Sequence, residues 1–418
     1  MDVLGRPPGP GPLSHVELDV GALREATPGC AERVHLNNAG AALCSRATLD
    51  AVIDHVELEG RLGGYEAATQ QAPQLDATRR AMAEVLGASV GEVALTGSDT
   101  AAWTKAFWGF VVAGGLRTRR RVVVDRAVYN SHHLAVLQAV RHLGVAVDVV
   151  APGPSGPIDL QALSSMLGPD VGLLTVTHVP THSGVVAPVH EVGDLARRAG
   201  VPFFLDACQS VGQLPVDVRE IGCDVATLTG RKWLRGPRGT GALFVREGFL
   251  DRLDPPGIDA SSAQWSPHGD EYTLAEDATR FEEFETSVAA RLGLGIALDE
   301  LLALGIDRVQ ARIAVLAAHL RSSIEAAPDL HGQDPAGERC GIVTFSVAGR
   351  DADEVAAHLS SSGINVSVSR AANSRLDFDT RGLDTVVRAA PHVYNTIDEL
   401  DLLVDALGSG GHARPATT

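Results

Sequence analysis

The segment 224–241 reads DVATLTGRKWLRGPRGTG: an apolar strand-like run, an Arg-Lys-Trp triplet and a glycine-rich turn before a second apolar run. It contains Lys232, and the only other lysine in the 418-residue chain is Lys105. Unlike arginine, a partly desolvated lysine can lose its proton and attack a carbonyl carbon. We therefore interpret Lys232 as a Schiff-base lysine; a surface lysine at a turn is the alternative.

Strand-like runs and helical patterns alternate on both sides of this segment. The strand-like runs are 92–96, 121–125, 145–150, 172–179, 201–206, 224–229 and 241–245. Strands that are apolar along their whole length and separated by helices are typical of a parallel sheet buried on both faces. We predict an α/β fold with a mostly parallel seven-stranded sheet and helices on both faces. Ligands of such sheets gather at the carboxyl ends of the strands.

Polar residues follow several of these runs, where a ligand is expected. Asp206 ends the apolar run 201–206, and burying its charge is costly unless a partner compensates it. The protonated ring nitrogen of a pyridoxal group is such a partner, and a helix N-cap is the alternative role. Gln209, three residues further on, can donate a hydrogen bond to the ring oxygen.

A phosphate and a carboxylate also have predicted partners. The turn LTGSDTAAW (95–103) leads from a strand into a helix, where backbone N–H groups and the helix dipole attract a phosphate. Thr229 and Arg231 flank Gly230 and can add a hydroxyl and a positive charge. Arg388 follows an apolar run and can grip the carboxylate of an amino-acid substrate, with a surface salt bridge as the alternative.

The composition excludes several classes of partner. The net charge of −17 and the aromatic content of 4% argue against nucleic acid and against an anionic membrane. Five cysteines without a CxxC pair are typical of reduced thiols, so we predict a cytoplasmic protein. No apolar run reaches the roughly 18 residues of a membrane span. His178 and His182 are four residues apart, but Pro180 disfavours a shared helical face, so no metal site is predicted.

The patterns also divide the chain into regions. We predict an N-terminal arm (1–45) packing on a small domain, a large domain (46–288), a smaller α+β domain (289–408) and a disordered tail (409–418). Within the large domain, Ser45 is the predicted N-cap of a helix that runs to Glu59. Its apolar residues Leu49, Val52, Ile53 and Val56 have the spacing of one helical face.

The motifs TGSDT, DACQ, TGRKW and RAAPHVYNT, in this order over about residues 35–405, resemble the class V aminotransferase fold of pyridoxal-phosphate enzymes. The resemblance implies a fold-type I homodimer with pyridoxal 5'-phosphate near the subunit interface. It implies that Lys232 forms the Schiff base, Asp206 faces the ring nitrogen and Arg388 holds the substrate carboxylate. The other implied cofactor contacts are Ser98, Asp99, Thr229 and Arg231 at the phosphate, Gln209 and Thr181 at the ring, and Tyr129 stacked on it.

Two departures from the family separate this chain from its cysteine desulfurases. The segment 369–382, SRAANSRLDFDTRG, lacks the cysteine that receives sulfur in those enzymes, and Thr181 stands where they usually carry asparagine. The stretches HLNNAGAALCS, GGYEAA and EFETSVAARLG instead resemble ergothioneine C–S lyases and related lincosamide-antibiotic enzymes. This resemblance implies substrate contacts at Asn38 and Tyr65, and a cofactor contact at Thr286 across the dimer interface.

The expected reaction is C–S β-elimination from an S-conjugated cysteine derivative, which yields a thiol, pyruvate and ammonia. Decarboxylation coupled to oxidative deamination and epimerisation remain alternatives, because the same cofactor serves all three reactions. A non-catalytic binding protein of the same fold is a further alternative, and it would lack the visible absorption band of a lysine-bound cofactor.

Overall fold

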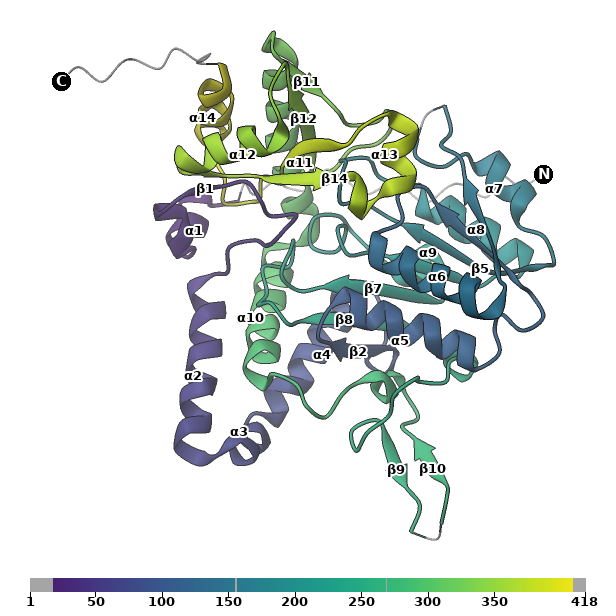
Figure 1. Ribbon diagram of the computed structural model, residues 1–418. Coiled ribbons are helices and arrows are strands. Elements are labelled where there is room, and N and C mark those ends of the chain that lie inside the picture. The colour runs from purple at the N-terminus through teal and green to yellow at the C-terminus, as the bar shows by residue number, and fades with distance from the viewer. Residues whose placement is uncertain (1–17, 155, 268, 409–418) are drawn as a thin grey trace, which may run out of the picture.

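The computed structural model describes residues 18–154, 156–267 and 269–408, with a seven-stranded sheet at its centre (Figure 1). The strands follow the order β2-β8-β7-β6-β5-β3-β4. They are β2 (Val93–Thr96), β3 (Arg121–Asp125), β4 (Ala146–Val150), β5 (Val171–Thr177), β6 (Phe203–Asp206), β7 (Val225–Thr229) and β8 (Gly241–Val245). Neighbouring strands pair in parallel, except that β8 is antiparallel to both β2 and β7. The predicted mostly parallel sheet is confirmed.

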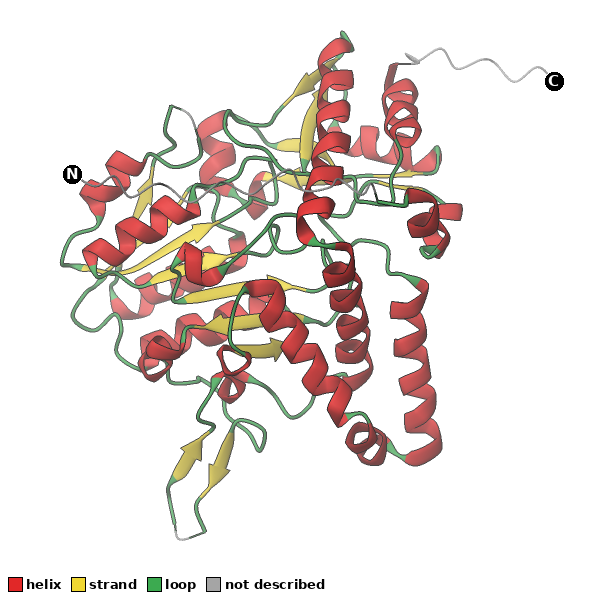
Figure 2. Cartoon of the chain, turned by 180° about the vertical axis from the view of Figure 1, so that it is seen from behind, coloured by secondary structure: helices red, strands yellow, loops and turns green. Residues whose placement is uncertain are grey.

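Two separate hydrophobic cores cover the two faces of this sheet. In β6, Phe203 and Leu205 belong to one core and Phe204 to the other, because successive side chains of a strand point to opposite faces. The first core includes residues of α4 (Ala72–Leu86), α7 (Leu160–Met166), α8 (Val189–Ala199), α9 (Val218–Ile221) and α10 (Val288–Leu304). The second includes α5 (Asp99–Val112) and α6 (Asn130–Leu143). Figure 2 shows the resulting layers from behind.

Several short elements connect or extend the large domain. The 3-10 turns are η2 (Val90–Glu92), η3 (Glu247–Arg252) and η4 (Ala278–Phe281). A hairpin of β9 (Ala263–Trp265) and β10 (Tyr272–Leu274) extends below the sheet in Figure 1. The sequence patterns do not predict this hairpin, since a strand of three residues is too short for an alternation of polar and apolar residues to be recognised.

A second sheet forms the smaller domain, in the antiparallel order β11-β12-β15-β14. Its strands are β11 (Leu330–Gly332), β12 (Val343–Val347), β14 (Ser367–Arg370) and β15 (Thr385–Ala389). Helices α11 (Ile306–Ala326), α12 (Ala352–Ser361) and α14 (Ile397–Gly408) share a third core with it, and η5 (Ala371–Asn373) and α13 (Arg375–Arg381) lie between β14 and β15. Among the described helices, none is long and apolar enough to cross a membrane.

The described part of the N-terminal arm lies against the small domain. It consists of α1 (Val20–Glu25), η1 (Pro28–Ala31) and β1 (Val34–His35), and β1 pairs in parallel with β13 (Ile364–Asn365). Arg24 forms an ion pair with Glu399 of α14 at 2.8 Å. Residues 1–17 of the predicted arm lie outside the described residues. The tail 409–418, which is predicted to be disordered, also lies outside them.

The boundary predicted between residues 288 and 289 places helix α10 in the small domain. Leu294 and Leu298 of α10 are fully buried in the first core, beside the large sheet. The next helix, α11, contributes to both cores, with Val309 and Ile313 in the first and Leu316 and Leu320 in the third. We therefore propose that the boundary lies within α11.

Helix α2 (Arg46–Leu62) begins where predicted, because Ser45 Oγ accepts a hydrogen bond from the Thr48 backbone N–H at 3.1 Å. The short helix α3 (Gly64–Gln70) follows it. The predicted apolar face, however, does not form part of a core: the exposed fractions of Leu49, Ile53 and Val56 are 36%, 51% and 54%. The helical spacing is correct, but Ile53 and Val56 of this face are more than half exposed among the described residues.

Candidate active site

A cavity of about 270 Å³ lies at the carboxyl ends of the parallel strands, and the predicted cofactor residues meet there. It is lined by the β2–α5 turn, the start of α6, the ends of β5 and β6, and the loop between β7 and β8. The predicted residues in its lining are Ser98, Asp99, Tyr129, Thr181, Asp206, Gln209, Thr229, Arg231 and Lys232. Segments separated by more than a hundred residues thus contribute to one site.

Lys232 lies in a tight loop that holds its side chain at the edge of the cavity. The Gly230 N–H donates to the Thr240 carbonyl at 2.9 Å, and any side chain at Gly230 would collide with Thr240 Oγ1, 2.2 Å from an added Cβ. Lys232 is only 9% exposed, and its Nζ lies 3.2 Å from the Cys208 sulfur. The lysine is therefore desolvated and close to Asp206, the residue that precedes Cys208 by two.

Asp206 lies at the end of β6 with an exposed fraction of 4%. Its Oδ1 accepts a hydrogen bond from the Cys208 backbone N–H at 2.9 Å, and its Oδ2 lies 3.4 Å from His132 Nδ1. Burial raises the pKa of the Asp206 carboxyl to about 6, and Asp99 adds to this rise, while His132 opposes it. A cation placed against Asp206 would therefore favour its charged form.

His132 is a site residue that the sequence analysis missed. It lies on α6, three residues after Tyr129 and thus on the same helical face. Its Nε2 lies 3.0 Å from Asp99 Oδ2, and its ring stacks on Trp103 with the centroids 4.1 Å apart. The i, i+3 spacing from Tyr129 was the available signal, but nothing in the sequence indicates that Asp99 and Asp206 would both reach this ring.

The Asp99 side chain has a different role from the predicted phosphate contact. Its carboxylate bonds to His132, and a carboxylate beside a phosphate would be repelled by it. Ser98 caps α5 by accepting from the Ala101 N–H at 3.1 Å, so the first backbone amides of the helix, including that of Asp99, remain for an anion. Arg238, which the sequence analysis did not single out, joins Arg231 in the lining.

Thr181 connects the ring side of the cavity to the substrate side. Its hydroxyl accepts hydrogen bonds from Gln209 Nε2 at 3.2 Å and from Arg388 Nη1 at 2.8 Å, so its own proton can still be donated. Gln209 is more constrained than predicted, because its Nε2 also donates to the Ala39 carbonyl at 3.0 Å and its Oε1 accepts from Trp233. Thr181 is thus the better placed donor toward a ring oxygen.

Thr229 lines the cavity, and Arg388 reaches its edge through a contact with Thr181. Thr229 Oγ1 donates to the Thr240 carbonyl at 3.1 Å, so its proton is already engaged. Arg388, on β15, is 6% exposed and donates from Nη1 to the Thr181 carbonyl at 2.7 Å and from Nη2 to Asn37 Oδ1 at 3.2 Å. Burial lowers the pKa of Arg388 to about 10, which still leaves it charged at neutral pH.

The side chain of Asn38, the predicted substrate contact, is bonded within the fold. The Asn38 amide donates to the Ala390 carbonyl at 2.7 Å and its oxygen accepts from the Tyr394 hydroxyl, so both ends are used inside the fold. Asn37 instead contacts Arg388. Tyr65 and Thr286 do not line the cavity within this chain, and Tyr65 is 74% exposed, so their predicted roles depend on a second subunit.

The His178/His182 pair is divided between two environments. His182 Nε2 lies 2.9 Å from Asp377 Oδ2, and its ring packs against Phe378 of α13. His178 is 5% exposed, and burial lowers its pKa to about 3, so it is neutral. His182 therefore anchors α13 beside the cavity.

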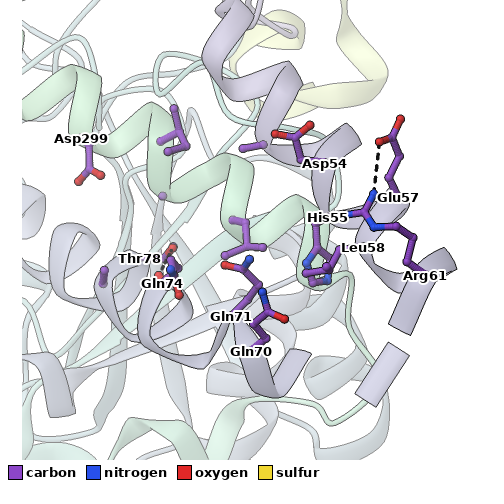
Figure 3. Close-up of a pocket in the computed structure, with 15 residues that line it drawn as sticks. Asp54, His55, Glu57, Leu58, Arg61, Gln70, Gln71, Gln74, Thr78 and Asp299 are labelled. Atoms are coloured by element: carbon purple, nitrogen blue, oxygen red, sulfur yellow. Dashed lines mark hydrogen bonds and ion pairs between the residues drawn. The ribbon is translucent and has the colours of Figure 1, made fainter. Parts of the chain in front are cut away.

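A second, larger hollow of about 590 Å³ lies between α2, α4 and α10 (Figure 3). Its lining consists of helix-surface residues such as Asp54, Gln74 and Asp299, and none of the predicted site residues belongs to it. Glu57 and Arg61 pair along α2 at 3.8 Å with both side chains more than half exposed. Solvent reaches these exposed groups, whereas His55 and Thr78 in the same lining are each 2% exposed. The hollow therefore lacks the cluster of buried carboxylates and buried lysine found at the Lys232 cavity.

The residues around Lys232 fit pyridoxal phosphate. Asp99 Oδ1 and Arg388 Nε are buried without a hydrogen-bond partner, and such atoms cost free energy unless a ligand or water satisfies them. The cavity offers an amine for an aldehyde carbon, a carboxylate for a ring nitrogen, and a helix N-terminus with two arginines for a phosphate. Each polar part of the cofactor thus has a matching group.

Comparison with known proteins agrees with this fit. The aminotransferase class-V family matches residues 34–403. A protein of Mycobacterium tuberculosis named "Probable hercynylcysteine sulfoxide lyase" is 31% identical, over 90% of this chain and 89% of its own. A protein of Xylella fastidiosa named "Probable cysteine desulfurase" is 28% identical, over 81% of this chain and 80% of its own.

Solved structures share the fold. A cysteine desulfurase from Thermococcus onnurineus has a TM-score of 0.85 at 24% identity, covering 93% of this chain and 97% of its own. A cystine C–S lyase in complex with cysteine persulfide has a TM-score of 0.80 at 21% identity, covering 92% and 99%. Another similar structure, with a TM-score of 0.83 at 21% identity, contains glycine covalently linked to its pyridoxal-phosphate cofactor. The chain belongs to the class V aminotransferase family and is a pyridoxal-phosphate-dependent lyase.

Proposed function

We propose that this enzyme is a C–S β-lyase that converts an S-conjugated cysteine derivative and water into a thiol, pyruvate and ammonia. The names of the relatives, a hercynylcysteine sulfoxide lyase and cysteine desulfurases, support C–S cleavage of cysteine derivatives in general. The β-lyase reaction is the more specific proposal. A role in thiol-containing secondary metabolism, of the ergothioneine or lincosamide type, is part of it.

The observation that carries the proposal is the structure of segment 369–382. It contains no cysteine, and it forms the end of β14, η5 and the helix α13. Phe378 of α13 is fully buried and Asp377 is paired with His182, so the segment is packed in place beside the cavity. Sulfur released here has no thiol of this segment to receive it, which favours departure as a free thiol over transfer to the enzyme.

The side chains around the cavity have complementary roles. When bound, pyridoxal phosphate supplies an electron sink for the negative charge left at the substrate α-carbon. We assign Lys232 to hold the cofactor's aldehyde carbon and, as a free amine, to take the α-proton of the substrate. Arg388, oriented by Thr181 and Asn37, holds the substrate carboxylate.

The environment of Arg388 favours elimination over decarboxylation. Its guanidinium is buried and charged, so a carboxylate bound to it is stabilised in its ionised form. Loss of carbon dioxide would remove that charge from its partner and leave the buried arginine uncompensated, which is costly. Proton removal at the α-carbon followed by loss of the thiol preserves the pair.

The test is a product assay with the holoenzyme and S-alkyl-cysteine, together with its sulfoxide. We expect the thiol or sulfenic acid, pyruvate and ammonia in equal amounts from each conjugate that is accepted. Recovery of an aldehyde and carbon dioxide, or of the opposite enantiomer, would contradict the proposal. The Lys232→Ala variant serves as the control for reactions that do not depend on the enzyme.

We further propose a homodimer whose interface includes the outer face of α2. Tyr65 and Phe284, from different segments, pack against each other with centroids 6.3 Å apart, yet their exposed fractions are 74% and 56%. Ile53 and Val56 of α2 are exposed as well, and exposed large apolar side chains are typical of protein interfaces. Such a dimer would allow Tyr65 and Thr286 to reach the partner's cavity.

We propose a cytoplasmic location for the enzyme. All five cysteines are free thiols, and Cys208 lies beside Lys232 at the cavity. Free thiols accord with a reducing compartment.

A further inference from the structure

A row of three buried ionisable side chains lies in the wall of the cavity, with Asp206 and Asp99 in the lining and His132 between them. Asp206 lies at the cavity, His132 comes next with Nδ1 3.4 Å from Asp206 Oδ2, and Asp99 follows with Oδ2 3.0 Å from His132 Nε2. The exposed fractions of Asp206, His132 and Asp99 are 4%, 0% and 5%. Water therefore does not screen the charges, and they interact more strongly than on a surface.

The position of His132 is set by three elements of the fold. The α6 backbone presents the residue, Trp103 of α5 covers one face of its ring, and Tyr129 meets the ring edge-on at 6.1 Å. Asp99 opens α5, and Asp206 ends β6. The ring therefore has little freedom to turn away, and its two nitrogens face the two carboxylates.

We propose that His132 is a positioning residue for the cofactor: as a cation between Asp99 and Asp206, it keeps the Asp206 carboxylate ionised, so that the ring nitrogen of bound pyridoxal phosphate stays protonated. This inference rests on the proposed role of Asp206. It assigns Asp99, predicted as a phosphate contact, to the support of His132. His132 acts through Asp206 and does not itself touch the substrate.

Electrostatics favours this arrangement over the alternatives. Two buried carboxylates near one another would repel, and one of them would take up a proton. If Asp206 took it, the carboxyl group would donate a hydrogen bond to a neutral ring nitrogen, and the ring would be a weaker electron sink. A cation between the two carboxylates stabilises the ionised form of both. The His132 ring contacts Asp206 directly, so its charge acts on that carboxylate first.

The other charged groups nearby do not change the charge states proposed for Asp206, His132 and Asp99. Burial opposes the imidazolium form, but Asp99 and Asp206 outweigh it and raise the pKa of His132 above its ordinary value, with Lys232 opposing. Burial raises the pKa of Asp125 to about 8, and Asp206 contributes to this rise, so Asp125 is largely neutral at pH 7. Asp99 and Asp206 are thus the carboxylates that hold the His132 cation.

The test is nuclear magnetic resonance of the holoenzyme reconstituted with pyridoxal phosphate labelled with ¹⁵N in the ring. In the native chain we expect a protonated ring nitrogen from pH 6 to pH 9. In His132→Gln we expect the apparent pKa of that nitrogen to fall by about one to three units, the usual effect of a charge at this distance. His133→Gln is the matched control, because His133 lies on the same helix and forms no ion pair among the described residues.

Two outcomes overturn the inference. One is an unchanged ring-nitrogen shift in His132→Gln. The other, which needs no variant, is the absence of a doubly protonated imidazole at pH 8 in the native holoenzyme labelled with ¹⁵N-histidine. Borohydride reduction followed by peptide mapping distinguishes failure of the proposed function from failure of this inference. If the cofactor is not fixed on Lys232, the proposed function fails. A cofactor fixed on Lys232 together with an unchanged ring-nitrogen shift refutes the role of His132 alone.

Discussion

The cavity at Lys232 and the hollow between α2, α4 and α10 differ in size and in chemistry, and the smaller of these two is the candidate site. The cavity at Lys232 measures about 270 Å³ and collects buried charged side chains from several segments of the large domain. The hollow between α2, α4 and α10 measures about 590 Å³ but is lined by side chains that project from helix surfaces (Figure 3). Buried charges cost free energy, and a fold keeps them where a ligand compensates them. The chemistry of the lining, and not the volume, distinguishes a site.

The largest expected effect comes from removing the amine of the smaller cavity. Lys232→Ala should lower the rate of thiol release by about 10³-fold or more, since both cofactor attachment and proton transfer lose their group. The visible absorption band of the bound cofactor should change with it. Asp299→Asn, in the larger hollow, should leave both quantities as in the native enzyme; a loss there equal to that of Lys232→Ala would reverse our choice of site.

A smaller effect is expected on the outer face of α2, which borders the larger hollow. Ile53→Asp places a charge on the proposed interface, and we expect the dimer dissociation constant to rise by about 100-fold, because an unpaired charge would be buried. Sedimentation velocity measures the change. Val315→Asp is the control, since Val315 is equally exposed at 59% but lies on α11 of the small domain. A monomeric native chain would refute the interface.

The pH dependence of stability at Asp125, near the smaller cavity, measures what a buried carboxylate charge costs in free energy of unfolding. The Asp125 folded-state pKa of about 8 lies above the value of about 3.9 in an unfolded chain, so the folded state holds one extra proton between these values. This group therefore reduces the free energy of unfolding by about 1.4 kcal/mol for each unit of rising pH in that window. Asp125→Asn should remove this slope. The free energy of unfolding measured by urea denaturation should therefore exceed that of the native chain by the largest amount near pH 8. An identical pH dependence in both proteins would contradict it.

The smallest expected effect concerns the helix that forms one wall of the larger hollow. Ser45→Ala removes the N-cap of α2 and should reduce the free energy of unfolding by about 1 kcal/mol, with no change in the cofactor spectrum. Ser45→Thr retains a hydroxyl and should lose less. Differential scanning calorimetry gives the comparison, and an equal loss in both variants would show that the cap hydroxyl is not the cause.

The sheet and most of the site were predictable because parallel strands impose their own geometry. Apolar runs separated by helices require a sheet covered on both faces, and the ends of such strands meet at one edge. Asp206, Lys232 and Thr181 could therefore be placed together before any contact was known. The scarcity of lysine then drew attention to Lys232.

Other features depended on contacts that sequence spacing does not contain. Asn37 and Asn38 are adjacent and chemically identical, and only the contacts across the fold show that Asn37, which forms a bridge with Ala390, faces Arg388. The apolar spacing of α2 is the same whether its face meets a core or solvent. His132 could be read as an ordinary helix residue until Asp99 and Asp206 were seen on either side of its ring.

The sequence by itself determined the class of fold, the family and the cofactor, because each depends on short segments with a fixed order along the chain. The tertiary structure decided which polar groups are already occupied: Gln209 by Trp233 and Ala39, Asn38 by Ala390, and Asp99 by His132. The reason is that a buried hydrogen bond depends on distance and direction between residues far apart in the chain. Local pattern carries no information on either.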